Sequence, residues 1–221
     1  MSKFRLYSAL LPLLFSTAFG SAPQKTITVF SIGNGNMTEC PLTSENRGWM
    51  QMLPMFFSMN VHFNNEAIKD KSVEEYLNEG HWDIVLSQLK EGDYVFIGFE
   101  REIQNKGMYQ KAIAKFISHV NQKKATPVPF TAPNTKKENN ITGNSIEEIS
   151  KKYNVVYLDL GKLTQNVLKK IKQKDNNDLS INEAIQVAHI AAQSIKNKIP
   201  DLNISDGENT DGKALFLPAA N

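Results

Sequence analysis

The residues that most often carry out covalent or metal chemistry are few and widely spaced in this sequence. Cys40 is the only cysteine, so the chain has no second thiol for an internal disulfide. A nucleophilic thiol needs a positioned base, and no such arrangement is visible near Cys40. The four histidines lack the short spacings of a zinc site; they are His62, His81, His119 and His189. The residue types alone therefore indicate neither a metal centre nor a thiol enzyme.

Short apolar runs alternate with helical patterns along the chain. The runs interpreted as strands are Ile27 to Ile32, Val61 to Phe63, Tyr94 to Phe99, Pro127 to Thr131 and Val155 to Leu158. Strands that alternate with helices form a parallel sheet covered on both faces. We therefore predict a three-layer α/β/α sandwich with a parallel five-stranded sheet. Ligands of such sheets bind beyond the carboxyl ends of the strands.

Helical spacing appears between these strands. Apolar residues recur with helical period over Trp49 to Phe57 and over Tyr109 to Val120. Two capping boxes, Ser145-x-x-Glu148 and Ser180-x-x-Glu183, predict the starts of two later helices. Trp49 and Trp82 lie in helical segments, and we interpret them as core anchors.

The N-terminal segment has the pattern of a secretory signal peptide. Lys3 and Arg5 precede an apolar stretch from Leu6 to Phe19, and small residues follow it. We predict a signal peptide over residues 1–22, one domain over 23–199 and a C-terminal tail over 200–221. The apolar stretch is short for a membrane span. The predicted location is therefore secreted or extracytoplasmic, with no stable span after cleavage.

The composition is that of a globular protein. The chain has 221 residues, of which 41% are hydrophobic and 22% are charged, so it can form one domain with a sizeable core. The formal net charge is only +2. No basic cluster with interleaved aromatic residues is present, which argues against a nucleic-acid partner.

Several segments carry a family resemblance. The densest runs from Glu79 to Ile97 and includes Glu-Gly-His-Trp-Asp-Ile and Leu-Lys-Glu-Gly-Asp-Tyr-Val-Phe-Ile. Shorter matches are Gly48-Trp49 and Asn65-Glu66-Ala67. From about Thr26 to Lys198 the chain resembles the SGNH (GDSL-like) hydrolases, and in particular their rhamnogalacturonan acetylesterase branch. These segments are mainly scaffold, so the resemblance implies a fold more strongly than an activity.

The first two sequence blocks that carry catalysis in this family are altered. The resemblance implies a nucleophilic Ser in a turn after the first strand, where this chain has Gly33-Asn34-Gly35-Asn36. Gly35 therefore stands at the nucleophile position and offers no hydroxyl. The second block contributes a Gly whose amide binds the oxyanion, and Asp70 stands there. A carboxylate near a developing negative charge opposes the transition state.

The other two blocks are altered as well. In the third, the family has an Asn that donates to the oxyanion, where this chain has Glu102. An ionised Glu cannot donate a hydrogen bond. The fourth block, Asp-x-x-His, keeps its acid as Asp178 but has Ile181 in place of the base. Nucleophile, oxyanion donors and base are thus all absent by this matching, which predicts a pseudoenzyme.

The altered positions suggest a ligand site of another kind. The resemblance brings three carboxylates to one cleft beside two amides, so the candidate ligand-binding residues are Asn34, Asn36, Asp70, Glu102 and Asp178. Carboxylates gathered in this way suit calcium or sugar hydroxyls. The flanking cations Lys69, Lys71 and Arg101 could instead neutralise them in ion pairs.

Two functions remain open at this stage. The first is a secreted relative of carbohydrate esterases that has lost esterase activity and binds a polysaccharide or an extracellular protein. The second is an active carbohydrate esterase with rearranged catalytic residues. Ser72, just past the second block, could face the cleft as a relocated nucleophile, whereas Ser31 lies within a strand. His189 lies about three helical turns beyond Asp178, too far along to reach the pocket.

Overall fold

A computed structural model gives the structure, which describes residues 25–99, 105–133, 141–170 and 178–202. Its centre is a parallel sheet in the order β2-β1-β3-β4. The strands are β1 (Ile27–Gly33), β2 (Val61–Asn65), β3 (Tyr94–Gly98) and β4 (Thr126–Pro129). The predicted α/β class and parallel sheet are confirmed, but the sheet has four strands in the described residues, not five.

The predicted fifth strand, Val155 to Leu158, is reduced to one parallel bridge between Leu158 and Phe130. The amides of Thr126 and Phe130 point toward β3, where they donate to Asp93 and Ile97. The alternate amides would have to serve the outer edge, but Pro127 and Pro129 have no N–H group. Thr131 is the first residue able to donate there, and its amide bonds Leu158 at 3.0 Å. Proline at alternate positions therefore prevents a longer ladder.

Seven α-helices and two 3-10 turns occupy the described residues. They are η1 (Gly35–Met37), α1 (Trp49–Met52), η2 (Leu53–Phe56), α2 (Val73–Asn78), α3 (His81–Gln88), α4 (Lys106–Gln122), α5 (Ile141–Tyr153), α6 (Leu160–Lys170) and α7 (Ile181–Lys198). The helix expected over Trp49 to Phe57 is split into α1 and η2, with Pro54 near the start of η2. The helix expected over Tyr109 to Val120 lies inside α4.

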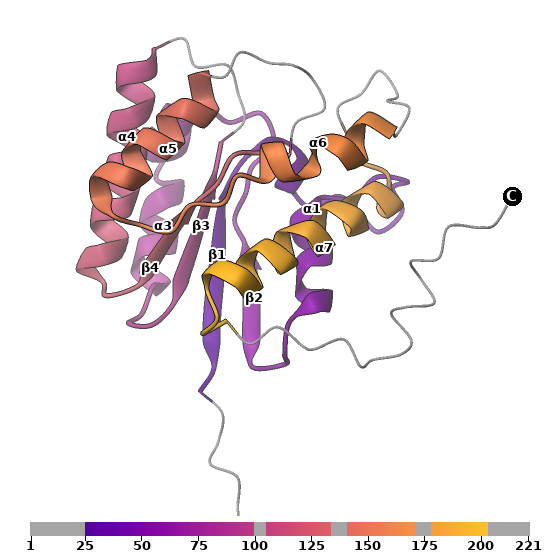
Figure 1. Ribbon diagram of the computed structural model, residues 1–221. Helices are drawn as coiled ribbons and strands as arrows, with labels where there is room; N and C mark the ends of the chain where they lie inside the picture. The colour runs from indigo at the N-terminus through magenta and orange to yellow at the C-terminus, as the bar shows by residue number, and fades with distance from the viewer. Residues whose placement is uncertain (1–24, 100–104, 134–140, 171–177, 203–221) are drawn as a thin grey trace, which may run out of the picture.

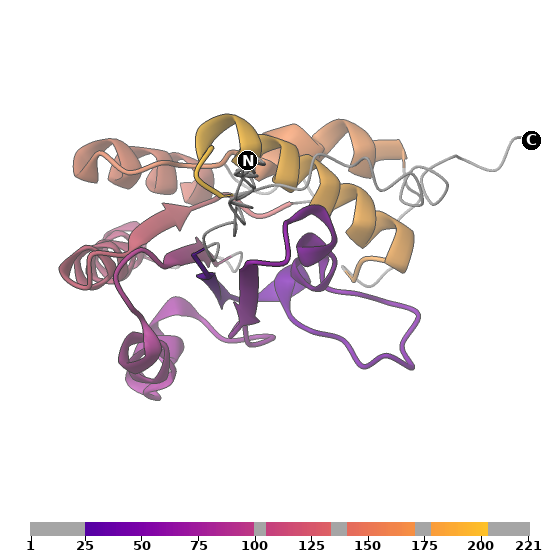
Figure 2. The same cartoon turned by 90° about the horizontal axis from the view of Figure 1, so that it is seen from below.

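Apolar side chains on the two faces of the sheet form separate cores. Val29 and Phe96 pack with residues of α1, α6 and α7. Phe30 and Val95 point to the other face and pack with residues of α2, α3, α4 and α5. Figure 1 shows α1 and α7 on one side of the strands and α3 and α4 on the other, and Figure 2 shows the sheet between α7 and α3. This confirms the three layers.

Both tryptophans are core residues, as predicted. Trp49 and Trp82 are each 1% exposed. Trp49 packs edge-on against Phe130, and Trp82 against Phe116. Trp82 lies in the Glu79 to Ile97 segment, and its Nε1 donates to Nδ1 of His119 at 3.0 Å. The segment that carries the densest family resemblance therefore builds the core.

The two capping boxes have different outcomes. Ser180 caps α7, and its hydroxyl accepts from the Glu183 amide, which confirms the second prediction. The first is wrong, because α5 begins at Ile141 and Ser145 is buried within it. The carboxylate of Glu148 accepts instead from Lys106 and Gln110 of α4.

The predicted domain boundaries stay predictions, because residues 1–24 and 203–221 lie outside the described ranges. Leu202, within the predicted tail, is 1% exposed and packs in the core beside α7. Among the helices that the structure describes, none is long and apolar enough to cross a membrane.

Candidate functional site

The turn after β1 is held close to β3. Gly33 and Gly98 are register partners, and a Cβ on Gly33 would lie 1.8 Å from the Gly98 carbonyl oxygen. Gly33 has a φ of 153° and Gly35 a φ of 62°, so both use backbone conformations that favour glycine. The turn thus places Gly35 at the carboxyl end of β1, where the family has its serine, and no side chain projects from it.

Asn34 and Asn36, two candidate ligand-binding residues, are built into this turn. Asn34 is 2% exposed, and its Nδ2 donates to the Lys71 carbonyl at 2.7 Å. Asn36 is 9% exposed. Next to it, the Met37 carbonyl accepts from Asn65 Nδ2 at 2.8 Å. Both amides are therefore largely covered, and the ligand-binding role predicted for them stays a prediction.

A network that the sequence analysis did not identify fixes the turn to β2. The Ser31 hydroxyl donates to Asn65 Oδ1 at 2.9 Å, so Ser31 is tied up inside the sheet and is fully buried. Through Asn65 it is linked to the Met37 carbonyl. The available signal was the Asn65-Glu66-Ala67 motif, which the resemblance singled out only as scaffold.

The loop after β2 runs directly beside this turn. The amide of Ile68 donates to the Gly33 carbonyl at 2.9 Å. Asp70 has a φ of 65°, in the left-handed region that glycine adopts readily and aspartate tolerates. This backbone conformation is the one expected where the family has a glycine, so it agrees with the matching of Asp70 to that position.

An ion pair joins this loop to the start of α7. Lys69 Nζ lies 3.0 Å and 3.1 Å from the two carboxylate oxygens of Asp178, 109 residues away in the sequence. The hydrogen bond that Lys69 donates to Asp178, reinforced by the charges of Asp178 and Asp70, raises the pKa of Lys69 above its ordinary value. Of the alternatives left open by the sequence, neutralisation by a flanking lysine is the one observed for Asp178.

The start of α7 is held by the loop that follows η1. The Arg47 amide donates to the Leu179 carbonyl at 2.9 Å, and Asn46 bridges to Ser180. Ile181, at the position of the family's histidine, begins α7 and is 42% exposed. An aliphatic side chain there supplies no base.

Ser72, His81 and His189, which could replace the missing nucleophile and base, take part in structural contacts. Ser72 caps α2; its hydroxyl accepts from the Glu75 amide and donates to the Glu75 carboxylate at 2.8 Å. His81 contacts Glu79 at 3.1 Å. His189, on α7, packs near Phe56 of η2. Within the part of the chain that the structure describes, the Ser72 hydroxyl forms its hydrogen bonds with Glu75 and none with either histidine. No relocated serine–histidine pair is therefore formed by these residues.

Not every predicted residue can be placed. Glu102 and Arg101 lie outside the described residues. Within the part of the chain that the structure describes, no three His, Cys, Asp or Glu residues gather as metal ligands. The calcium hypothesis depends on Glu102 and stays a prediction, while the loop carrying Asp70 and the carboxylate of Asp178 do meet, through Lys69.

Comparison with known proteins adds family evidence to this geometry. The chain is 27% identical over 116 residues to the rhamnogalacturonan acetylesterase RhgT of Bacillus subtilis. The matched segment covers 49% of this chain and 50% of RhgT. No family model matches the chain. The chain therefore matches about half the length of the curated relative.

Solved structures agree on the architecture. Protein YXIM of Bacillus subtilis superposes with a TM-score of 0.70 at 18% identity, over 78% of this chain and 57% of that one. A mutant of the acetyl-xylooligosaccharide esterase Axe2 from Geobacillus gives a TM-score of 0.58 at 12% identity, over 79% and 94%. A lipolytic G-D-S-L family protein of Veillonella parvula gives 0.54 at 14% identity, over 80% and 100%.

The chain has the SGNH-hydrolase fold. Its similarity to RhgT supports the rhamnogalacturonan acetylesterase-like branch of that superfamily, as the resemblance implied. Within this SGNH-like protein, the scaffold is retained, whereas the positions that carry catalysis in the family hold Gly35, Asp70 and Ile181 in the described residues.

Proposed function

We propose that this SGNH-like protein is a secreted, non-catalytic binding protein whose ligand is a carbohydrate or an extracellular protein. The proposal rests on the residues that occupy the positions where the family has its catalytic residues. Gly35 has no nucleophile, and the one acid that matches the family, Asp178, is engaged by Lys69.

The family's chemistry requires an activated hydroxyl, a base oriented by an acid, and donors aimed at the oxyanion. In this chain Asp178 would have to orient a histidine at position 181, but Ile181 cannot accept a proton. Asp70 keeps a backbone amide but adds a carboxylate at the position where the family has a glycine. Loss of a single triad member already lowers the rate by orders of magnitude, so this arrangement supports no esterase reaction of the family type.

The similarity to RhgT supports a carbohydrate as the proposed ligand. RhgT is named as a rhamnogalacturonan acetylesterase, and we propose that this chain retains recognition of such a polysaccharide without cleaving its esters. The carboxylate of Asp178, which is partly exposed beside Lys69, can accept hydrogen bonds from sugar hydroxyls. An extracellular protein ligand is the second form of the same proposal.

Hydrolysis is the first test. We expect the full chain to hydrolyse p-nitrophenyl acetate and acetylated pectin no faster than buffer. Its Ser72→Ala variant is the matched control, because Ser72 is the serine considered as a relocated nucleophile. Turnover by the parent and not by the variant would support the competing function, an active esterase with a relocated nucleophile.

Binding and location are tested separately. We expect acetylated pectin to retard the full chain in affinity electrophoresis, and expect Asp178→Asn to reduce that retardation. Equal migration with and without pectin would overturn the carbohydrate form of the proposal. For the predicted signal peptide, N-terminal sequencing of the exported chain should begin near Pro23, and a chain retained in the cytosol would contradict secretion.

A further inference from the structure

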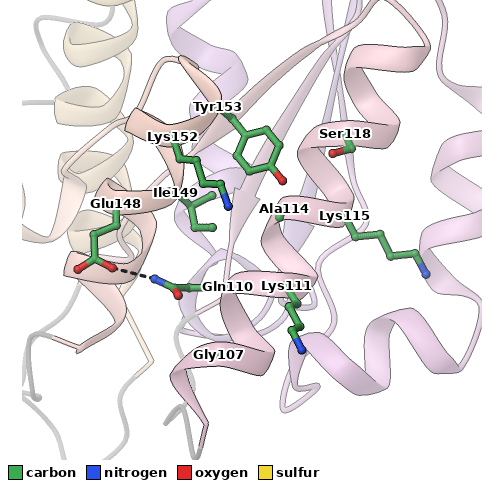
Figure 3. Close-up of a pocket in the computed structure, with 10 residues that line it drawn as sticks. All are labelled: Gly107, Gln110, Lys111, Ala114, Lys115, Ser118, Glu148, Ile149, Lys152 and Tyr153. Atoms are coloured by element: carbon green, nitrogen blue, oxygen red, sulfur yellow. Dashed lines mark hydrogen bonds between the residues drawn. The ribbon is translucent and has the colours of Figure 1, made fainter.

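Helices α4 and α5 pack side by side and leave a groove between their outer surfaces (Figure 3). The apolar part of its lining is formed by Ala114 of α4 and by Ile149 and Tyr153 of α5. Ile149 is 7% exposed and belongs to the core below, so the floor of the groove is anchored. This groove is formed by the surfaces of α4 and α5. It does not include the turn, the loop or the start of α7 that form the candidate site.

Positive charge lies on both sides of this floor. Lys111 and Lys115 extend from α4, one helical turn apart, and Lys152 extends from α5 toward the groove (Figure 3). All three side chains are exposed. Lys111 and Lys115 repel each other because they lie one turn apart, so this pair does not stabilise α4.

The one carboxylate in the lining does not offset these lysines. Glu148 lies 2.9 Å from Lys106 Nζ and accepts from Gln110 Nε2 at 2.8 Å. Its pKa is lowered, first by the hydrogen bond from Lys106, so its charge is already paired. Within the described part of the chain, none of the three groove lysines forms an ion pair with a carboxylate, whereas Lys124 and Lys151 elsewhere on the surface do.

We propose that the groove binds an acidic amphipathic helix of a protein partner, with its apolar side chains on the floor and its carboxylates facing Lys111, Lys115 and Lys152. An apolar centre with a charged rim is the usual anatomy of a protein interface. A helix laid in a groove uses such a floor for its apolar face. A small anion would need donors that converge on one point, but here the lysines stand apart around apolar atoms.

The proposal is independent of the proposed function, because binding at α4 and α5 requires nothing of Gly35, Asp70 or Asp178. The test uses the full chain and a fluorescent synthetic amphipathic helix composed of Leu and Glu. We expect saturable binding by anisotropy that weakens as salt is added. A Ser and Glu peptide with the same charges should bind at least about tenfold more weakly, since it lacks an apolar face.

Two matched triple variants locate the site. Lys111→Gln, Lys115→Gln and Lys152→Gln together should raise the Kd of the Leu and Glu helix at least about tenfold. Lys25→Gln, Lys90→Gln and Lys162→Gln remove the same charge from exposed lysines outside the groove, and should leave the Kd within about twofold. Thermal midpoints of both variants check that the fold is intact.

Any of four results would overturn the proposal. They are no binding of the Leu and Glu helix, equal binding of the Ser and Glu peptide, equal losses in the two triple variants, and binding of polygalacturonate in preference to the helix. The last would identify the groove as a site for an acidic polysaccharide.

Discussion

Lysines at the carboxyl end of the sheet form ion pairs with carboxylates, whereas lysines on the α4–α5 groove do not among the described residues. Lys69 and Lys71, in the loop after β2, form ion pairs with Asp178 and Glu79. Lys111, Lys115 and Lys152 form none with a carboxylate among the described residues. The first region satisfies its charges within the chain, and the second presents them to solvent. The charges of the loop after β2 are therefore paired within the chain, whereas no described carboxylate neutralises the groove lysines.

The comparison predicts the largest loss of stability where the turn after β1 packs most closely against β3. In Gly33→Ala, the new Cβ would meet the Gly98 carbonyl oxygen at 1.8 Å, at a φ that L residues rarely adopt. We expect the free energy of unfolding to fall by about 3 kcal/mol or more. Urea denaturation measures it, and a stability like that of the parent would contradict the close contact of β1 and β3 at this turn.

A smaller loss is expected from the buried amide beside it. Asn34→Ala removes the donor to the Lys71 carbonyl and leaves that acceptor with one bond fewer in a covered position. We expect a loss of about 1–3 kcal/mol by urea denaturation. If Asn34 serves a ligand and not the fold, this variant will keep its stability and lose pectin binding instead.

The sequence predicted most of what builds these regions and missed what connects them. Short continuous apolar runs located all four strands, because strands of a parallel sheet covered on both faces carry apolar residues along most of their length. The prediction of a fifth strand was wrong because a hydrophobic pattern does not show which edge of β4 lacks N–H donors. Pro127 and Pro129 both face the outer edge. Ser145 failed because a capping pattern inside a longer helix looks the same as one at its start.

The residues at the candidate site could be predicted from the sequence, but their contacts could not. The positions of Gly35, Asp70 and Ile181 came from residue matching, and the left-handed backbone at Asp70 agrees with it. The pairing of Lys69 with Asp178 joins residues 109 positions apart, so no local pattern could distinguish it from pairing with Asp70 or Glu102.

The ion pair itself predicts a modest, pH-dependent effect. In Lys69→Met we expect a loss of about 0.2–1 kcal/mol at neutral pH, because both partners are partly exposed. The raised pKa of Lys69 means that its contribution is fully present below the unfolded value of 10.5 and is lost as the pH rises through the folded value. Urea midpoints of parent and variant should therefore converge above that pH. Lys90→Met, an exposed lysine with no carboxylate partner in the described contacts, is the control and should match the parent throughout.

The groove lysines should give the smallest effect on stability, and this is what separates the two regions. Replacing Lys111, Lys115 and Lys152 together by Gln removes three exposed charges that stabilise no described carboxylate. We expect a change within about 0.5 kcal/mol. A slight gain is favoured, because Lys111 and Lys115 repel each other one turn apart on α4. A loss above about 1 kcal/mol by urea denaturation would mean that these lysines are paired within the fold. In that case the contrast with Lys69 would fail, and so would the reason for assigning the groove to a partner.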